Sequence, residues 1–162
     1  MRIIGIDPGT ATTGFSIIDY DRKKMKLLDF GCIKTKSTSP MGARLNQISK
    51  DLTTLIKKYK PQKASIENLF FNKNVKTAIT VAQARGVIIQ TLEKHKIPQK
   101  EYTPGQIKLA VCGHGRADKK AVQQMLKVIF GLKNPPKPDD AADAIAAAIC
   151  TANHIELGKK SS

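Results

Sequence analysis

The N-terminal segment contains two apolar runs that are separated by only a short turn. In RIIGIDPGTATTGFSII, the run 2–7 is followed by a turn rich in Gly and Thr and then by a second run, 14–20. Two strands joined by so short a connection must pair antiparallel, because a parallel pair needs a crossover of about a dozen residues or more. The chain is therefore expected to begin with an antiparallel hairpin.

The rest of the chain alternates between strand and helix patterns. A third strand is expected at 26–35 with a bulge at Gly31, and a helix begins at Ser39 and Pro40 with apolar residues at helical spacing. Three strands followed by helix, strand, helix and strand predict a mixed α/β sheet covered by helices. The remaining elements are expected to be a strand at 63–67, a helix at 75–94, a strand at 97–103, and helices at 104–111, 117–130 and 139–155.

The charge balance indicates a polyanionic partner. Lys and Arg number 28 against 13 Asp and Glu, a formal net charge of +15. Nucleic acid is the expected partner of such a chain, and a merely solvated basic surface is the alternative. No apolar run is long enough to span a bilayer, and the positive charges are not gathered on one amphipathic helix, so no membrane role is expected.

The three cysteines are far apart and include no CxxC pair. Cys32, Cys112 and Cys150 are therefore expected to be reduced thiols in a cytoplasmic protein. One sharper alternative is a zinc site that combines Cys112 and His114 with Cys150 and His154. These spacings fit no common zinc module, so buried, unligated cysteines are favoured.

Two apolar strands end in an acid, Asp7 in the first and Glu67 in the fourth. If both strands are parallel neighbours, the acids emerge at the same edge of the sheet, where ligands of open α/β sheets bind. Two carboxylates placed there repel each other unless a cation lies between them. Taken alone, Asp7 has two other interpretations. In one it only starts the turn, and in the other it lies beside phosphates in a nucleotide-binding loop.

A third acidic element is the segment PDDAADAIAAAI. Asp140 and Asp143 share a face of the expected helix, whose alanines allow close packing on the sheet. The alternative is a helix N-cap with favourable charge, a role for which Asp139 competes. Four acids gathered in so basic a chain suit two Mg²⁺ ions and phosphodiester chemistry. The candidate ligands are Asp7, Glu67, Asp140 and Asp143.

Residues suited to contact nucleic acid follow Glu67 and fill the loop CGHGRADKK. The aromatic pair Phe70 and Phe71 either stacks on bases or contributes one ring to the core. The glycine loop is either an ordinary turn between helices or a phosphate track made of backbone N–H groups and basic side chains. The candidate contacts are Phe70, Phe71, Lys73, Arg116, Lys119 and Lys120.

The helix at 75–94 has an apolar arc of roughly half its circumference, wider than the ~100° that a one-sided surface helix needs. Part of this arc can cover the sheet, and the rest, including Ile88 on one flank, is expected to meet a second copy of the chain. Ala82 and Gly86 would allow close approach, and Arg85 is expected to pair with an acid or a helix carbonyl there. The predicted dimer interface is Ala82, Arg85, Gly86 and Ile89.

Four segments in order, GIDPGTATTGF, SIENLFFNKN, AQARGV and DDAADAIAAAI, resemble the bacterial RuvC-type Holliday junction resolvases. The resemblance implies a ribonuclease-H-like α/β fold, with a mixed five-stranded sheet whose second strand is antiparallel, flanked by helices. It implies one nuclease domain over 1–156, with 157–162 as a frayed tail, and a cytoplasmic homodimer. The implied activity is paired nicking of four-way DNA junctions with two Mg²⁺ ions per site, for which Mn²⁺ is expected to substitute, in recombination and repair beside a branch-migration helicase complex.

The resemblance also assigns residues. It places the metal-binding acids at Asp7, Glu67, Asp140 and Asp143, the stacking aromatic at Phe70 and phosphate-contacting lysines at Lys108 and Lys119. Three other interpretations remain open at this point. They are an RNase-H-like nuclease acting on another nucleic acid, a nucleotide-binding domain of the actin, Hsp70 and sugar-kinase type, and a basic DNA-binding module without chemistry.

Overall fold

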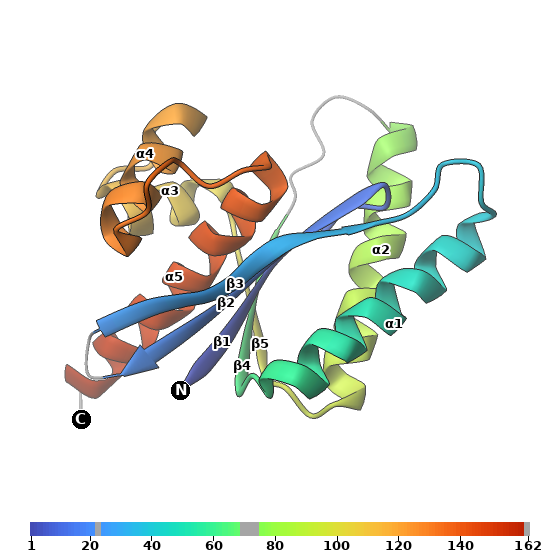
Figure 1. Ribbon diagram of the computed structural model, residues 1–162, viewed down its shortest axis with the longest axis horizontal. Coiled ribbons are helices and arrows are strands. Elements are labelled where there is room, and N and C mark those ends of the chain that lie inside the picture. Colours follow the sequence, from blue (N-terminus) through green and yellow to red (C-terminus); the bar gives the residue numbers. More distant parts are fainter. Residues whose placement is uncertain (22–23, 69–74, 161–162) are drawn as a thin grey trace.

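A computed structural model describes residues 1–21, 24–68 and 75–160. The strands are β1 (Arg2–Asp7), β2 (Thr12–Asp21), β3 (Lys24–Lys34), β4 (Lys63–Glu67) and β5 (Gln99–Tyr102). They form one sheet in the order β3-β2-β1-β4-β5 (Figure 1). β2 is antiparallel to β1 and β3, whereas β4 is parallel to β1 and β5 is parallel to β4. The predicted mixed sheet with an antiparallel second strand is therefore confirmed.

Helices cover both faces of this sheet (Figure 1). They are α1 (Met41–Tyr59), α2 (Val75–Lys94), α3 (Pro104–Cys112), α4 (Lys119–Phe130) and α5 (Asp139–Lys160). Since side chains alternate along a strand, the side chain of Ile3 in β1 enters the core beneath α5, and those of Ile4 and Ile6 enter the core beneath α1 and α2. The odd-numbered residues of β1, Asp7 among them, therefore face α5.

Two glycines allow α5 to lie directly on the backbone of the hairpin. A Cβ atom added to Gly5 would lie 2.0 Å from the carbonyl oxygen of Ala144, and one added to Gly14 would lie 1.9 Å from that of Asp140. Real Cβ atoms never approach oxygen so closely, so any side chain here would lift the helix off the sheet. The two glycines thus set the height of the N-terminal half of α5.

Two buried serines fix α5 along the strands. Ser16 Oγ of β2 donates a hydrogen bond to the carbonyl oxygen of Ala144 at 2.9 Å, and Ser65 Oγ of β4 donates to that of Ala147. Both serines are fully buried, and these bonds satisfy their hydroxyl groups. Together with the alanine face of the helix, they determine which residues of α5 lie above β1 and β4.

The structure differs from the sequence-based expectation in two details. The irregularity between β2 and β3 lies at Leu28, because Ile17 pairs with Asp29 and Ile18 with Leu27. Gly31 pairs regularly, and a Cβ there would come within 3.2 Å of the Phe15 ring, so its lack of a side chain accommodates that ring. At the other end, α5 extends to Lys160, beyond the expected helix end at residue 155.

Candidate metal and nucleic-acid site

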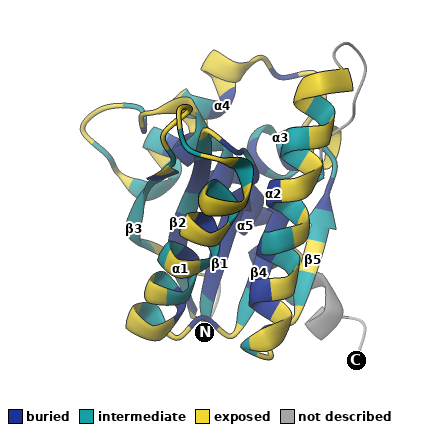
Figure 2. Ribbon diagram, turned by 90° about the vertical axis from the view of Figure 1, so that its right-hand side faces the viewer, coloured by how far each residue is buried: buried dark blue, intermediate teal, exposed yellow. Residues whose placement is uncertain are grey.

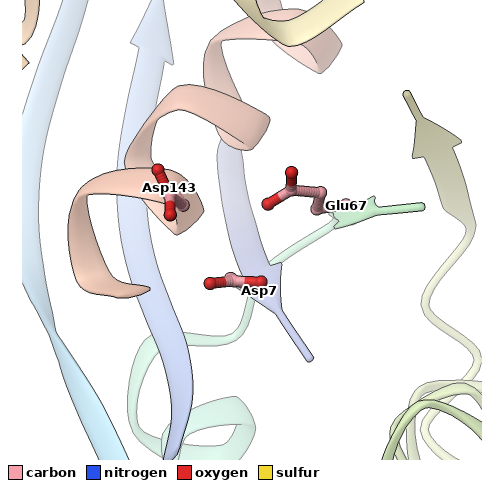
Figure 3. Close-up of side chains that lie close together, drawn as sticks. All are labelled: Asp7, Glu67 and Asp143. Atoms are coloured by element: carbon pink, nitrogen blue, oxygen red, sulfur yellow. The ribbon is translucent and has the colours of Figure 1, made fainter. Parts of the chain in front are cut away.

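Three carboxylates from separate elements converge at one edge of the sheet (Figure 3). Asp7 ends β1, Glu67 ends β4, and Asp143 lies in the second turn of α5. One oxygen of each lies within 4.8 Å of the others. The parallel pairing of β1 with β4 and the alternation of side chains bring Asp7 and Glu67 to the same face, and the docking of α5 places Asp143 opposite them.

Burial and mutual repulsion make these acids hard to ionise. Burial raises the pKa of Asp7 to about 8, and the carboxylates of Glu67, Asp143 and Asp140 add to the rise. Burial and then Asp143 raise the pKa of Glu67 to about 7. The pKa of Asp143 is also raised by burial, against the opposing effect of Lys119. A divalent cation among the three would offset both the desolvation and the repulsion.

The donor set fits a hard cation. All three candidate ligands offer carboxylate oxygens, which suit Mg²⁺ and Mn²⁺ and leave no soft ligand for zinc. In the described part of the chain, no Cys or His joins any group of three candidate metal ligands. Cys150 is buried with its thiol directed at the carbonyl oxygen of Gln106, and His154 contacts Lys100. The zinc alternative thus has no structural support among these residues.

Asp139 and Asp140 have different surroundings. Asp140 is half-buried and close enough to contribute to the raised pKa of Asp7, but it is not one of the three acids whose oxygens converge. Asp139 is exposed and contacts α4, where its Oδ1 accepts a hydrogen bond from Gln123 Nε2 at 2.7 Å. That bond, with Lys119, lowers the pKa of Asp139. Asp140 thus acts on Asp7, whereas both Asp139 and Asp140 add to the raised pKa of Asp143.

Two predicted phosphate-contacting lysines lie beside the acids. Lys119, the first residue of α4, has its Nζ 3.2 Å from Asp139 Oδ2 and 3.3 Å from Asp143 Oδ2. Lys108 of α3 lines, with Lys119, Glu67 and Asp143, a hollow of about 220 Å³. The sequence did not predict the contact of Lys119 with Asp143, because the two residues belong to separate helices whose packing no local pattern specifies.

Of the other predicted DNA contacts, two lie within the residues that the structure describes. Arg116 and Lys120 are exposed near the start of α4. Phe70, Phe71 and Lys73 lie outside the described residues.

The apolar arc of α2 is divided between the core and the surface. Ile88 is fully buried under α1 and the sheet, so its predicted place at a dimer interface is wrong. Val75 and Ile79 are 77% and 56% exposed, and Ala82 and Gly86 are also exposed. Their helical spacing puts these four residues on one outward stripe of α2, whose ribbon has a largely exposed side (Figure 2). Ile89 is half-buried.

Arg85 also has a partner within its own chain. Its guanidinium forms an ion pair with Glu101 of β5. The expectation that Arg85 pairs with an acid is met inside one protomer, so a partner chain is not needed to neutralise it.

The mixed five-stranded sheet, with helices on both faces and carboxylates converging from β1, β4 and α5, defines the ribonuclease-H-like class. The sequence profile described as "Crossover junction endodeoxyribonuclease RuvC" matches residues 3–151. The chain belongs to this family.

Members of this family are similar to the chain in both sequence and structure. The crossover junction endodeoxyribonuclease RuvC of Finegoldia magna is 53% identical, with 93% of this chain and 92% of the relative covered. That of Clostridioides difficile is 49% identical over 98% and 94% of the two chains. The structure of Thermus thermophilus RuvC has a TM-score of 0.90 at 31% identity, covering 98% and 97%. The same protein in complex with a Holliday junction substrate has a TM-score of 0.92, covering 98% and 96%.

Across the described ranges, none of the helices is long and apolar enough to cross a membrane.

The raised pKa values predict that the metal-free protein loses stability as the pH rises. Asp7 binds a proton in the folded state up to about pH 8, whereas in the unfolded chain it releases it near pH 4. The folded state therefore holds more protons between these values, and the free energy of unfolding should fall by a few kcal/mol from pH 5 to pH 9. Thermal denaturation in EDTA should show a falling Tm, and Mg²⁺ should restore it at pH 8 to 9. A Tm insensitive to both would contradict this electrostatic description.

Proposed function

We propose that this protein is a structure-selective endonuclease that resolves four-way DNA junctions by paired, symmetric, metal-dependent nicks in homologous recombination and DNA repair. The observation that carries the proposal is the convergence of Asp7, Glu67 and Asp143 in a family of crossover junction endodeoxyribonucleases. The net charge of +15 supports a nucleic-acid substrate, because acids alone would repel DNA.

In this proposal the acids are ligands of Mg²⁺, and Mn²⁺ can replace it. Asp7, Glu67 and Asp143 would hold the metal, and Asp140 would complete the set for two ions per site. The chemistry that such ions supply is activation of the attacking water and stabilisation of the leaving oxygen. Lys108 and Lys119 would bind the phosphates of the cleaved strand, and Phe70, Phe71, Lys73, Arg116 and Lys120 remain proposed DNA contacts.

Substrate choice is the direct test of the proposal. A four-way junction, a linear duplex of the same sequence and an RNA–DNA hybrid would be compared with Mg²⁺ at equal concentration. Cleavage of the junction at paired positions, far faster than of the other two, is expected. Preferential cleavage of the hybrid would instead favour an RNase-H-like nuclease with another substrate. ATP hydrolysis without nicking would favour the nucleotide-binding alternative.

Asp140 and Asp139 should respond differently to the same substitution. Asp140→Asn is expected to abolish most junction cleavage, because it removes a charge beside Asp7. Asp139→Asn is expected to retain cleavage and to change stability little, because solvent screens an exposed ion pair. Single-turnover nicking and thermal denaturation of both variants would be measured together. The reverse pattern would place Asp139, not Asp140, among the ligands.

We further propose a two-fold homodimer in the bacterial cytoplasm, served by a branch-migration helicase complex. A junction is roughly two-fold symmetric, so an isologous dimer would present two identical sites to opposing strands. The stripe through Val75, Ile79, Ala82 and Gly86 is the proposed interface. An added Cβ at Gly86 meets nothing within 4 Å, which leaves room for close approach by a partner backbone.

Ile79→Glu should convert the dimer to a folded monomer and uncouple the two nicks. Ile79 is 56% exposed, so the substitution should leave the fold intact while placing a charge on the interface. Sedimentation equilibrium at micromolar protein without DNA measures the change. The matched control is Val128→Glu on α4, also an exposed aliphatic residue, which should remain dimeric. If wild type and both variants sediment as single chains, the dimer forms only on DNA.

A further inference from the structure

A second basic hollow lies where β3 ends and α1 begins. It has a volume of about 290 Å³, and its lining includes Lys34, Lys36 and Arg44 together with the polar side chains of Thr35 and Ser39. Lys34 and Lys36 are exposed, whereas Arg44 is half-buried. Lys108 and Lys119 belong to α3 and α4, on the other face of the sheet, so this hollow is separate from theirs.

Among the described residues, no acid lies within ion-pair distance of the basic side chains that line the hollow. Across the described ranges, Lys34, Lys36 and Arg44 form no ion pair, and the first turn of α1 contains no acidic residue. The nearest acid along α1, Asp51, accepts a hydrogen bond from Gln47 instead. Three cations that share a concave surface repel one another, and a bound anion would relieve that repulsion.

A chain of hydrogen bonds connects the hollow to the loop that follows Asp7. Arg44 Nε donates to Thr35 Oγ1 at 2.8 Å, and Thr35 Oγ1 donates to the carbonyl oxygen of Thr10 at 2.6 Å. Thr10 Oγ1 in turn donates to the carbonyl oxygen of Thr80 in α2 at 2.6 Å. Arg44 and Thr35 are thus held at a fixed position relative to the turn that begins at Asp7.

The hollow is at the same edge of the sheet as the three acids. Lys34 pairs with Thr12, at the start of β2, while Asp7 pairs with Gly14 two residues further along that strand. Figure 1 shows the β3–α1 connection and the β1–β2 turn at the same end of the molecule, beside the start of α2. A DNA strand that crosses this edge would meet basic side chains on both faces of the sheet, with the acids between them.

We propose that the hollow formed by Lys34, Lys36 and Arg44 binds a phosphate of the DNA backbone and anchors the substrate on the α1 side of the acids. The proposal rests on the proposed function, because it assumes that the substrate is DNA. Arg and Lys at such positions fix the register of DNA without reading its sequence. The hollow therefore contributes to affinity and placement, and the chemical step remains with the acids.

The test is the salt dependence of binding in EDTA, where no cleavage occurs. Binding of a fluorescent four-way junction and of a linear duplex would be measured from about 50 to 200 mM salt for wild type and for Lys34→Ala/Lys36→Ala. Each lost phosphate contact should reduce the slope of log K against log salt by about 0.9 on duplex DNA, with about a tenfold loss of affinity at low salt. The matched control is Lys57→Ala/Lys58→Ala at the other end of α1, which should retain the wild-type slope.

The outcomes separate this proposal from the proposed function. A slope for Lys34→Ala/Lys36→Ala equal to that of wild type, on both DNAs, would overturn the phosphate site. Wild type that binds the junction no better than the duplex would count against junction selectivity, yet the duplex slopes would still decide whether the hollow binds phosphate.

Discussion

Asp7→Asn is expected to abolish junction nicking while junction binding in EDTA persists. The amide keeps the size of the side chain but removes one charge from the three converging carboxylates. Loss of one ligand from a metal-assisted site should lower the cleavage rate by about 10²–10³-fold or more. Single-turnover nicking with Mg²⁺ and gel-shift affinity without metal, measured on the same preparation, separate chemistry from binding.

The same substitution should stabilise the metal-free protein. An uncharged amide avoids the desolvation and repulsion that raise the pKa of Asp7 to about 8. In EDTA at pH 8 to 9, the Tm of Asp7→Asn should therefore exceed that of wild type, and Mg²⁺ should raise it less. An Asp7→Asn variant that nicks the junction at nearly the wild-type rate would contradict the role of Asp7 as a metal ligand. A lower Tm would show that Asp7 has a stabilising structural role.

Gly5→Ala should be among the most destabilising single-methyl changes in the chain. The added carbon would lie 2.0 Å from the Ala144 carbonyl oxygen and 2.7 Å from Ser16 Oγ, and backbone cannot move away as a flexible side chain can. Lifting α5 would break its packing and its bond to Ser16, with an expected cost of about 3 kcal/mol or more. Chemical denaturation of the metal-free protein measures this cost.

Gly42→Ala is the matched control for this change. Gly42 lies in α1, and an added Cβ there meets nothing within 4 Å, so the higher helix propensity of Ala should stabilise by a few tenths of a kcal/mol to about 1. If Gly5→Ala and Gly42→Ala have equal stability, α5 does not lie on the hairpin as the structure describes. Any Gly5→Ala protein that folds should also cut poorly, since a lifted α5 carries Asp143 away from Asp7.

The antiparallel hairpin was predictable because its cause is local, and the meeting of Asp7 with Glu67 was predictable on the condition that β1 and β4 are parallel neighbours. A short turn permits only antiparallel pairing, and an acid at the end of an apolar strand emerges at the sheet edge once the neighbouring strand is parallel. The period of two in β1 also assigns Asp7 to one face, together with Gly5 and opposite Ile4 and Ile6. The hairpin and the face on which Asp7 lies follow from residues close together in the chain.

The placement of the acids in α5 and the division of the apolar arc of α2 between core and surface could not be predicted, because both depend on tertiary packing. Helical spacing puts Asp140 and Asp143 on one face, but only the height and rotation of α5, set by Gly5, Gly14 and the buried serines, bring Asp143 into the cluster. The same limit explains the wrong prediction for Ile88, because an apolar arc on a helix does not reveal which part of it packs on the sheet of its own chain.

The sequence by itself thus determined the order of the elements, the pairing of the hairpin and the edge at which Asp7 and Glu67 emerge, because these depend on local periodicity and connection length. Only the tertiary structure decided that Lys119 reaches Asp143 and that Arg44 is bonded through Thr35 to the turn after Asp7. Such contacts join residues far apart in the chain, and their geometry depends on how whole helices pack on the sheet.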